Sequence, residues 1–81
     1  MNNVFLIGIL VDLLEQNKNL LRANMRVSNT LIPIVCYNAL AELAYDALLE
    51  GSTIAINGSL QRPYKDLEVV VTKIIRIGGE E

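Results

Sequence analysis

The chain of 81 residues contains no histidine and no tryptophan, and it has one cysteine, Cys36. Without histidine, the sequence lacks the commonest general base and metal ligand in proteins. One cysteine cannot form a disulfide within the chain, and it does not supply the cysteine pairs that hold zinc. No glycine-rich phosphate loop or nucleophile motif is present either. We therefore expect a protein with no metal, no cofactor and no small-molecule substrate, and we do not expect an enzyme.

Long hydrophobic runs are also missing. No segment approaches the roughly 18–20 apolar residues that cross a bilayer, and the first residues lack the positive charge of a secretory signal. These two absences lead us to expect a cytoplasmic protein that does not contact a membrane. Hydrophobic residues make up 52% of the chain, which is too many for a disordered protein. Residues 1–81 are therefore expected to fold as one small domain.

The charge is unevenly distributed along the chain. Seven Lys and Arg residues against nine Asp and Glu residues give a net charge of −2, which is the wrong sign for a generic nucleic-acid binder. Five of the acids lie in the segment 42–50 or at residues 80–81. The other four acids stand against all seven bases, so the rest of the chain carries a net charge of +3.

Five apolar segments are predicted to be strands, and they cover residues 3–11, 20–28, 31–37, 52–60 and 67–77. The first is apolar on both faces, which is typical of a strand that is buried on both sides. The second alternates, and its polar face carries Arg22, Asn24 and Arg26. Gly8 and Gly58 interrupt two of the strands, as glycine does where a barrel bends sharply.

One helix is predicted between the third and fourth strands. Asn38 is its expected N-cap, and Gly51 stands where a helix of this length ends. Glu42, Asp46 and Glu50 follow at a spacing of four residues and are expected to form a solvated acidic face. The apolar face is formed by residues with helical spacing, Leu40, Leu43, Ala44, Ala47 and Leu48.

The expected order is strand, strand, strand, helix, strand, strand. This is the order of the OB-fold, an all-β fold with one helix, in which five strands form a Greek-key barrel and the helix lies between strands three and four. Proteins with this fold bind ligands on the face of strands two and three and on the loops beside it. Polar residues predict turns at 15–19 and 28–30. Cys36 alternates with apolar neighbours and is expected to be a buried, unreactive thiol.

Three segments resemble the bacterial single-stranded-DNA-binding proteins. They are Met1–Gly8 (MNNVFLIG), Ile34–Glu42 (IVCYNALAE) and Glu50–Gln61 (EGSTIAINGSLQ), and they follow the order of that family. The resemblance implies an OB-fold that binds single-stranded DNA without strong sequence preference, in replication, recombination or repair. It also implies a homodimer or homotetramer built partly through the first strand, with an interface at Val4, Phe5, Leu6 and Ile7.

The chain also departs from this family. The long hairpin that is usual between the second and third strands is reduced to Ser28–Thr30, and the loop between the fourth and fifth strands is reduced to Arg62–Asp66. Leu31 stands where the family has a stacking aromatic, and tryptophan is absent. These departures leave a second interpretation open, in which the OB-fold is a protein-interaction module of the primosomal type with weak or lost DNA binding.

Binding a single strand requires flat side chains that stack on bases and cations that follow the phosphates. Tyr37 aligns with a stacking aromatic of the family, and Tyr64 lies in the last loop between basic neighbours. Arg22 and Arg26, about 13 Å apart along one strand, form the strongest cationic pair. The candidate nucleic-acid-binding residues are therefore Tyr37, Tyr64, Arg22, Arg26, Arg62 and Lys65. The alternatives are tyrosines that pack against the barrel and bases that are ordinary surface residues. A stacking surface does not distinguish DNA from RNA.

Overall fold

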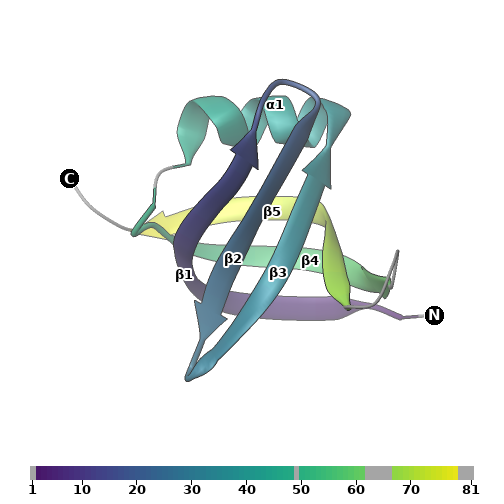
Figure 1. Ribbon diagram of the computed structural model, residues 1–81. Coiled ribbons are helices and arrows are strands. Elements are labelled where there is room, and N and C mark those ends of the chain that lie inside the picture. Colours follow the sequence, from purple (N-terminus) through teal and green to yellow (C-terminus); the bar gives the residue numbers. More distant parts are fainter. Residues whose placement is uncertain (1, 49, 62–66, 79–81) are drawn as a thin grey trace.

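A computed structural model describes residues 2–48, 50–61 and 67–78 of the chain (Figure 1). Strands and helix follow one another in the predicted order, which is therefore confirmed. The elements are β1 (Val4–Gln16), β2 (Leu20–Val27), β3 (Thr30–Tyr37), α1 (Asn38–Ala47), β4 (Thr53–Gln61) and β5 (Glu68–Gly78).

The strands form one closed barrel in the order β1-β2-β3-β5-β4. Strand β1 curves around the barrel, so that its first half pairs with β4 and its second half pairs with β2 (Figure 1). The barrel closes where β3 runs parallel to β5, with Ile34 beside Val69 and Val35 beside Val70. A closed five-stranded barrel with a helix between its third and fourth strands is an OB-fold, so the predicted fold is confirmed.

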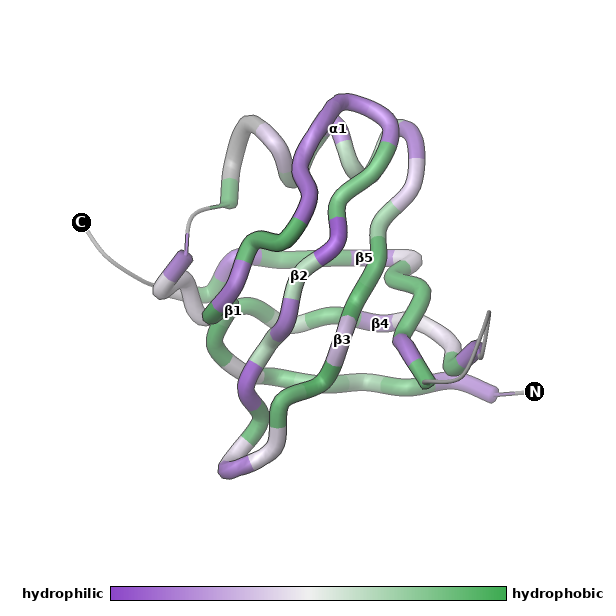
Figure 2. The backbone as a smooth tube through the Cα atoms, in the orientation of Figure 1, coloured by the Kyte–Doolittle hydropathy of each residue, from purple (hydrophilic) through white to green (hydrophobic). Residues whose placement is uncertain are grey.

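Apolar side chains fill the barrel, and α1 lies across one end of it (Figure 1). Ala41 and Ala44 of the helix are buried in the same cluster as the strand residues. Figure 2 shows that hydrophobic residues also follow most of the first half of β1. No helix in the described part of the chain is long and apolar enough to span a membrane. The largest fully buried side chains are Leu10, Leu21, Met25, Ile34, Ile54 and Ile56.

The ends of α1 differ from the prediction. The helix begins at Asn38, whose backbone has a φ of 55°, and the preceding Tyr37 provides no side-chain cap. Asn38 is therefore not the N-cap. The helix ends at Ala47, so Gly51 does not end it. Gly51 instead has a φ of 94° in the turn into β4, where its amide donates a 2.7 Å hydrogen bond to the carbonyl of Leu10.

Because the helix ends early, Glu50 does not belong to an acidic helix face as predicted. Its carboxylate accepts a 2.9 Å hydrogen bond from the backbone amide of Leu13, where the pairing of β1 with β2 is irregular. Strand β1 continues to Gln16, so the predicted turn at residues 15–19 is too long by two residues. The remaining turn is stabilised by Asn17, whose side-chain oxygen accepts hydrogen bonds from two amides, including that of Leu20 at 3.0 Å.

The sequence predicts sharp bends at Gly8 and Gly58, and the structure shows that the backbones of neighbouring strands approach closely at both glycines. A methyl group at Gly8 would overlap the backbone carbonyl oxygen of Arg26, and one at Gly58 would overlap that of Val70. A larger side chain at either position therefore forces two backbones apart. The absence of a side chain at these positions permits the tight coiling that closes a five-stranded barrel.

Cys36 is fully buried in the core, as predicted. Burial raises the pKa of its thiol to about 11, because the thiolate would lose the water that stabilises its charge. The thiol is therefore protonated at neutral pH and behaves as a small hydrophobic side chain.

Candidate nucleic-acid interface

All three predicted binding residues that the structure describes, Tyr37, Arg22 and Arg26, lie on the outward side of β2 and β3. The inward side of β2 carries Leu21, Ala23 and Met25, all fully buried, so the predicted alternation is confirmed. The tight turn predicted at residues 28–30 is also present, because Val27 pairs directly with Thr30. We define the β2–β3 face as the outward residues Leu20, Arg22, Asn24 and Arg26 of β2, paired with Tyr37, Val35, Pro33 and Leu31 of β3.

Tyr37 lies at the end of β3, opposite Leu20. It is 43% exposed, so it is not the packed core tyrosine that the sequence left as an alternative. Leu31, at the other end of the same strand, is also exposed. The two residues are six positions apart, which corresponds to about 20 Å along a strand. An exposed ring at a strand end has a free surface on which a base can stack.

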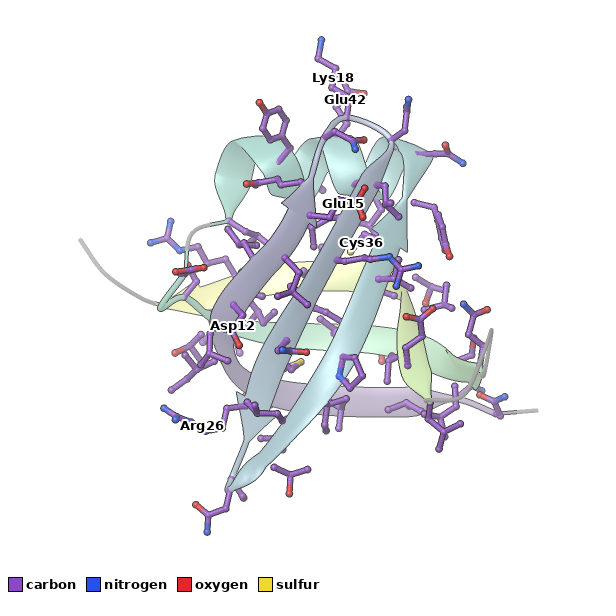
Figure 3. All side chains as sticks on the ribbon, viewed as in Figure 1. Asp12, Glu15, Lys18, Arg26, Cys36 and Glu42 are labelled. Atoms are coloured by element: carbon purple, nitrogen blue, oxygen red, sulfur yellow. The ribbon has the colours of Figure 1, made fainter. Side chains whose placement is uncertain are left out.

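Arg26 lies near the far end of β2, beside Leu31. Its side chain points away from the barrel, at the opposite end of β2 from Lys18 (Figure 3). It is exposed, and within the described residues no carboxylate lies at ion-pairing distance from it. Arg26 is therefore a cation that can meet a phosphate without first losing a partner.

Arg22 differs from Arg26 because its guanidinium group already has partners. Its Nη1 donates a hydrogen bond to Oε1 of Glu68 at 3.1 Å, and its Nε lies 3.9 Å from Oε1 of Glu15. The side chain of Glu68 is only 8% exposed, whereas that of Arg22 is 38% exposed. The structure thus places Arg22 on the predicted face, in an ion pair that the sequence analysis did not anticipate.

Carboxylates of β1 also border the β2–β3 face. Glu15 pairs in register with Arg22, and Asp12 pairs with Asn24. Oδ2 of Asp12 accepts a 3.3 Å hydrogen bond from Nδ2 of Asn24. The edge of the face toward β1 is therefore acidic, and the positive charge of the face is concentrated near Arg26.

Two residues of this site were missed by the sequence analysis, Glu68 and Gln61. Oε2 of Glu68 accepts a 2.9 Å hydrogen bond from Nε2 of Gln61. The available signal was a charged residue directly before three valines at the start of a strand, but its partner Arg22 lies 46 positions away in the sequence. The predicted residues Arg62, Tyr64 and Lys65 lie outside the described residues.

Within one chain, the first strand is buried on one face only, so burial on both faces would require a second copy of the chain. Phe5 is 61% exposed and Ile7 is 50% exposed, whereas Leu6 packs against the core and Val4 is half-buried. Of the four predicted interface residues, two therefore present side chains outward. One apolar side of the strand packs against the core, and the other apolar side faces outward.

The outward side of β1 continues onto β4 and β5, where one row of residues is apolar and the next row carries Asn57 and Lys73. Ile7 pairs with Ala55, and Ala55 pairs with Ile75, which is 52% exposed. The neighbouring row consists of Phe5, Asn57 and Lys73. We define the β1–β4–β5 face as these six residues, Phe5, Ile7, Ala55, Asn57, Lys73 and Ile75. Exposed apolar side chains in adjacent rows of a small domain are typical of an interaction surface.

The chain is similar in fold to solved structures of single-stranded-DNA-binding proteins. No protein-family model matches the chain, and no curated protein matches it in sequence. Similarity to solved structures is extensive, although sequence identity is low.

The single-stranded-DNA-binding domain of a protein from Synechococcus sp. matches with a TM-score of 0.81 at 17% identity, over 91% of this chain and 93% of that one. A mitochondrial single-stranded DNA-binding protein from S. cerevisiae matches with a TM-score of 0.80 at 10% identity, over 96% of both chains. A small single-stranded DNA-binding protein from Streptomyces coelicolor matches with a TM-score of 0.74 at 12% identity, over 93% of this chain and 91% of that one. At these identities the matches demonstrate a shared fold.

Proposed function

We propose that this protein binds single-stranded DNA on the β2–β3 face without strong sequence preference. The observation that carries the proposal is the presence of an exposed tyrosine, Tyr37, and an exposed arginine without an ion pair among the described residues, Arg26, on one face of an OB-fold barrel. The similar structures are single-stranded-DNA-binding proteins by name, which supports the same ligand class for this chain. Because a fold alone does not define a function, the proposal depends on these side chains.

The chemistry of this face suits a flexible strand of any sequence. Stacking of a base on Tyr37 contributes about 1–3 kcal/mol, and every base has a flat surface that can stack. Arg26 neutralises a phosphate and releases a counterion, so binding weakens as salt is added. Neither interaction reads the edge of a base. We propose that Tyr64, Arg62 and Lys65 also bind the single strand. We further propose that the protein is non-enzymatic and cytoplasmic, and that it serves replication, recombination or repair.

We also propose that the protein is a homo-oligomer. Phe5, Ile7 and Ile75 would be buried if two β1–β4–β5 faces met, and a small domain benefits from the additional core. Residues 4–8 of β1 pair with β4 on one side. They do not pair with β2, because the pairing of β1 with β2 begins at Ile9. The other backbone edge of this segment, which includes Val4 and Leu6, can therefore pair with the same strand of a second copy. A dimer doubles the number of cationic groups available to one DNA strand.

The binding proposal is tested by titrating labelled oligo(dT) at several salt concentrations. The logarithm of the affinity should fall linearly with the logarithm of the salt concentration, with a slope of about −0.7 for each phosphate neutralised. Arg26→Gln should reduce the steepness by about 0.7, whereas Arg26→Lys, which keeps the charge, should restore it.

Stacking is tested separately. Tyr37→Ala should weaken binding by about 1–3 kcal/mol and leave the salt dependence unchanged, whereas Tyr37→Phe keeps the ring and should bind nearly as well. Tyr45→Ala is the matched control, because Tyr45 is 45% exposed but lies on α1, away from the β2–β3 face. Equal effects at both tyrosines would contradict the placement of the site.

A protein-interaction module is the second candidate function. The acidic edge formed by Asp12 and Glu15, and the ion pair at Arg22, favour it because they reduce the positive charge of the β2–β3 face. Absence of oligo(dT) binding even at low salt would support this function over the first. A matched oligo(rU) titration distinguishes DNA from RNA as the ligand.

A further inference from the structure

Glu68 is the charged residue that the described structure buries most. It is 6% exposed, and among the described residues Ser52 is the other buried polar residue. Both carboxylate oxygens are engaged, Oε1 with Arg22 at 3.1 Å and Oε2 with Gln61 at 2.9 Å. A buried carboxylate with a partner on each oxygen is held in one position, because movement would leave a buried charge without compensation.

The ion pair crosses the β2–β3 face. Strand β3 lies between β2 and β5 in the barrel, and Val35 of β3 pairs with Arg22 on one side and with Val70 on the other. A contact from Arg22 to Glu68 therefore has to pass over β3 close to Val35. Val35 is fully buried although it belongs to the outward face and not to the core cluster. The burial of Val35 is the result expected if the ion pair covers it.

A negative charge on this face affects DNA binding in two ways. A phosphate that approaches Arg22 has to replace Glu68, which would then remain buried and unpaired. Glu68 also repels the phosphates of any strand that lies across β3. Arg26, which has no such partner in the described part of the chain, is not subject to the first of these effects.

We propose that Glu68 is an internal competitor with phosphate for Arg22, and that the Arg22–Glu68–Gln61 network sets the affinity of the β2–β3 face for single strands. This proposal rests on the proposed function. It assigns Arg22 to the network and leaves Arg26 as the phosphate-binding residue of β2. Glu68 is a positioning residue, since it acts through the guanidinium group that it holds.

The test compares Glu68→Gln with Glu42→Gln by oligo(dT) titration between 50 and 200 mM salt. Both variants remove one negative charge, but Glu42 is exposed on α1, whereas Glu68 lies beside Arg22. Glu68→Gln should bind more tightly than the control at low salt, with a salt dependence steeper by about 0.7, which equals an additional change of about 2.6-fold over this range. Adding Arg22→Gln to Glu68→Gln should remove that increment.

A second variant does not depend on the stability of Glu68→Gln. Arg22→Gln alone keeps a donor for Glu68, and it should leave the salt dependence of the natural protein unchanged. A loss of about 0.7 in steepness would show that Arg22 contacts a phosphate and would overturn the proposal. Equal salt dependence in Glu68→Gln and Glu42→Gln would overturn it as well.

The outcomes separate this proposal from the proposed function. If the natural protein binds and Glu68→Gln behaves like Glu42→Gln, only the role of Glu68 is wrong. If the natural protein does not bind and Glu68→Gln does, the role of Glu68 as a competitor for Arg22 is supported, and DNA binding by the natural chain is refuted. If neither binds at low salt, both proposals are wrong. Thermal melting of each variant confirms that the proteins compared are folded.

Discussion

Replacement of Gly58 by alanine should destabilise the barrel strongly. Gly58 is buried in β4, where it pairs with Val4 of β1 and Val71 of β5. A methyl group there would overlap the carbonyl oxygen of Val70 and would lie 2.9 Å from Cγ1 of Val69. The carbonyl belongs to the backbone and cannot rotate away, so β4 and β5 have to separate. Because β4 also pairs with β1, the displacement disturbs the pairing of β4 with both of its neighbours in the barrel.

The expected magnitude follows from the cost of inserting a methyl group into a packed site, about 1–3 kcal/mol. A chain of this length has a total free energy of unfolding of about 4–12 kcal/mol. Each kcal/mol lowers the midpoint of thermal unfolding by about 4–8 °C in a domain of this size. We therefore expect Gly58→Ala to melt about 4–24 °C below the natural protein.

Gly78→Ala is the matched control, because a methyl group at Gly78 meets no atom within 4 Å. This variant should be neutral or slightly stabilised, by up to about 1 kcal/mol, since alanine restricts the unfolded chain. Both variants are measured by circular dichroism at one protein concentration, because oligomer stability depends on concentration. If Gly58→Ala has the same midpoint of thermal unfolding as the natural protein, the argument that close backbone approach requires glycine is refuted.

Three further predictions concern other parts of the barrel. The pKa of the Cys36 thiol is raised to about 11, so the thiol should react with a disulfide reagent at pH 8 only after unfolding. The free energy of unfolding should fall as the pH rises from about 9 to 11, because the folded state keeps a proton that the unfolded state releases. Ile75→Asp should dissociate the homo-oligomer, measured by light scattering, and leave the monomer folded, since Ile75 is exposed in the single chain. Arg22→Ala should destabilise the protein by about 1–3 kcal/mol in chemical denaturation, because it leaves the buried carboxylate of Glu68 without its cation. The loss is smaller than for a fully buried ion pair, since the side chain of Arg22 is partly exposed to water.

The order of the elements could be predicted because it depends on local patterns. The alternation of β2 specified which side chains face inward, and Gly8 and Gly58 marked positions of close backbone approach. Alternation repeats every two residues, so a strand of eight residues carries the pattern several times. Helix ends carry much less information, and Asn38 and Gly51 were assigned to caps that the structure does not form.

The contacts of Glu50 show why polar partners could not be predicted. Its spacing from Glu42 fits a helix, and local spacing alone assigns it to the solvated helix surface. In the barrel its carboxylate accepts a hydrogen bond from the amide of Leu13, 37 positions away. Such a contact depends on the end of the helix and on an irregular register in β1, and neither is visible in a hydrophobic pattern.

To predict the charge of the β2–β3 face also requires knowledge of contacts between residues that are distant in the sequence. The sequence assigns Arg22 and Arg26 to one face of one strand, and a count of charges treats them as equal. They differ because β5 lies beside β3 and brings Glu68 within 3.1 Å of Arg22, while no described carboxylate reaches Arg26. The parallel pairing of β3 and β5 joins segments separated by the helix and β4. The net charge of +3 outside the acidic segments therefore overstates the positive charge available to a phosphate, since an arginine contributes to binding only to the extent that the fold leaves it unpaired.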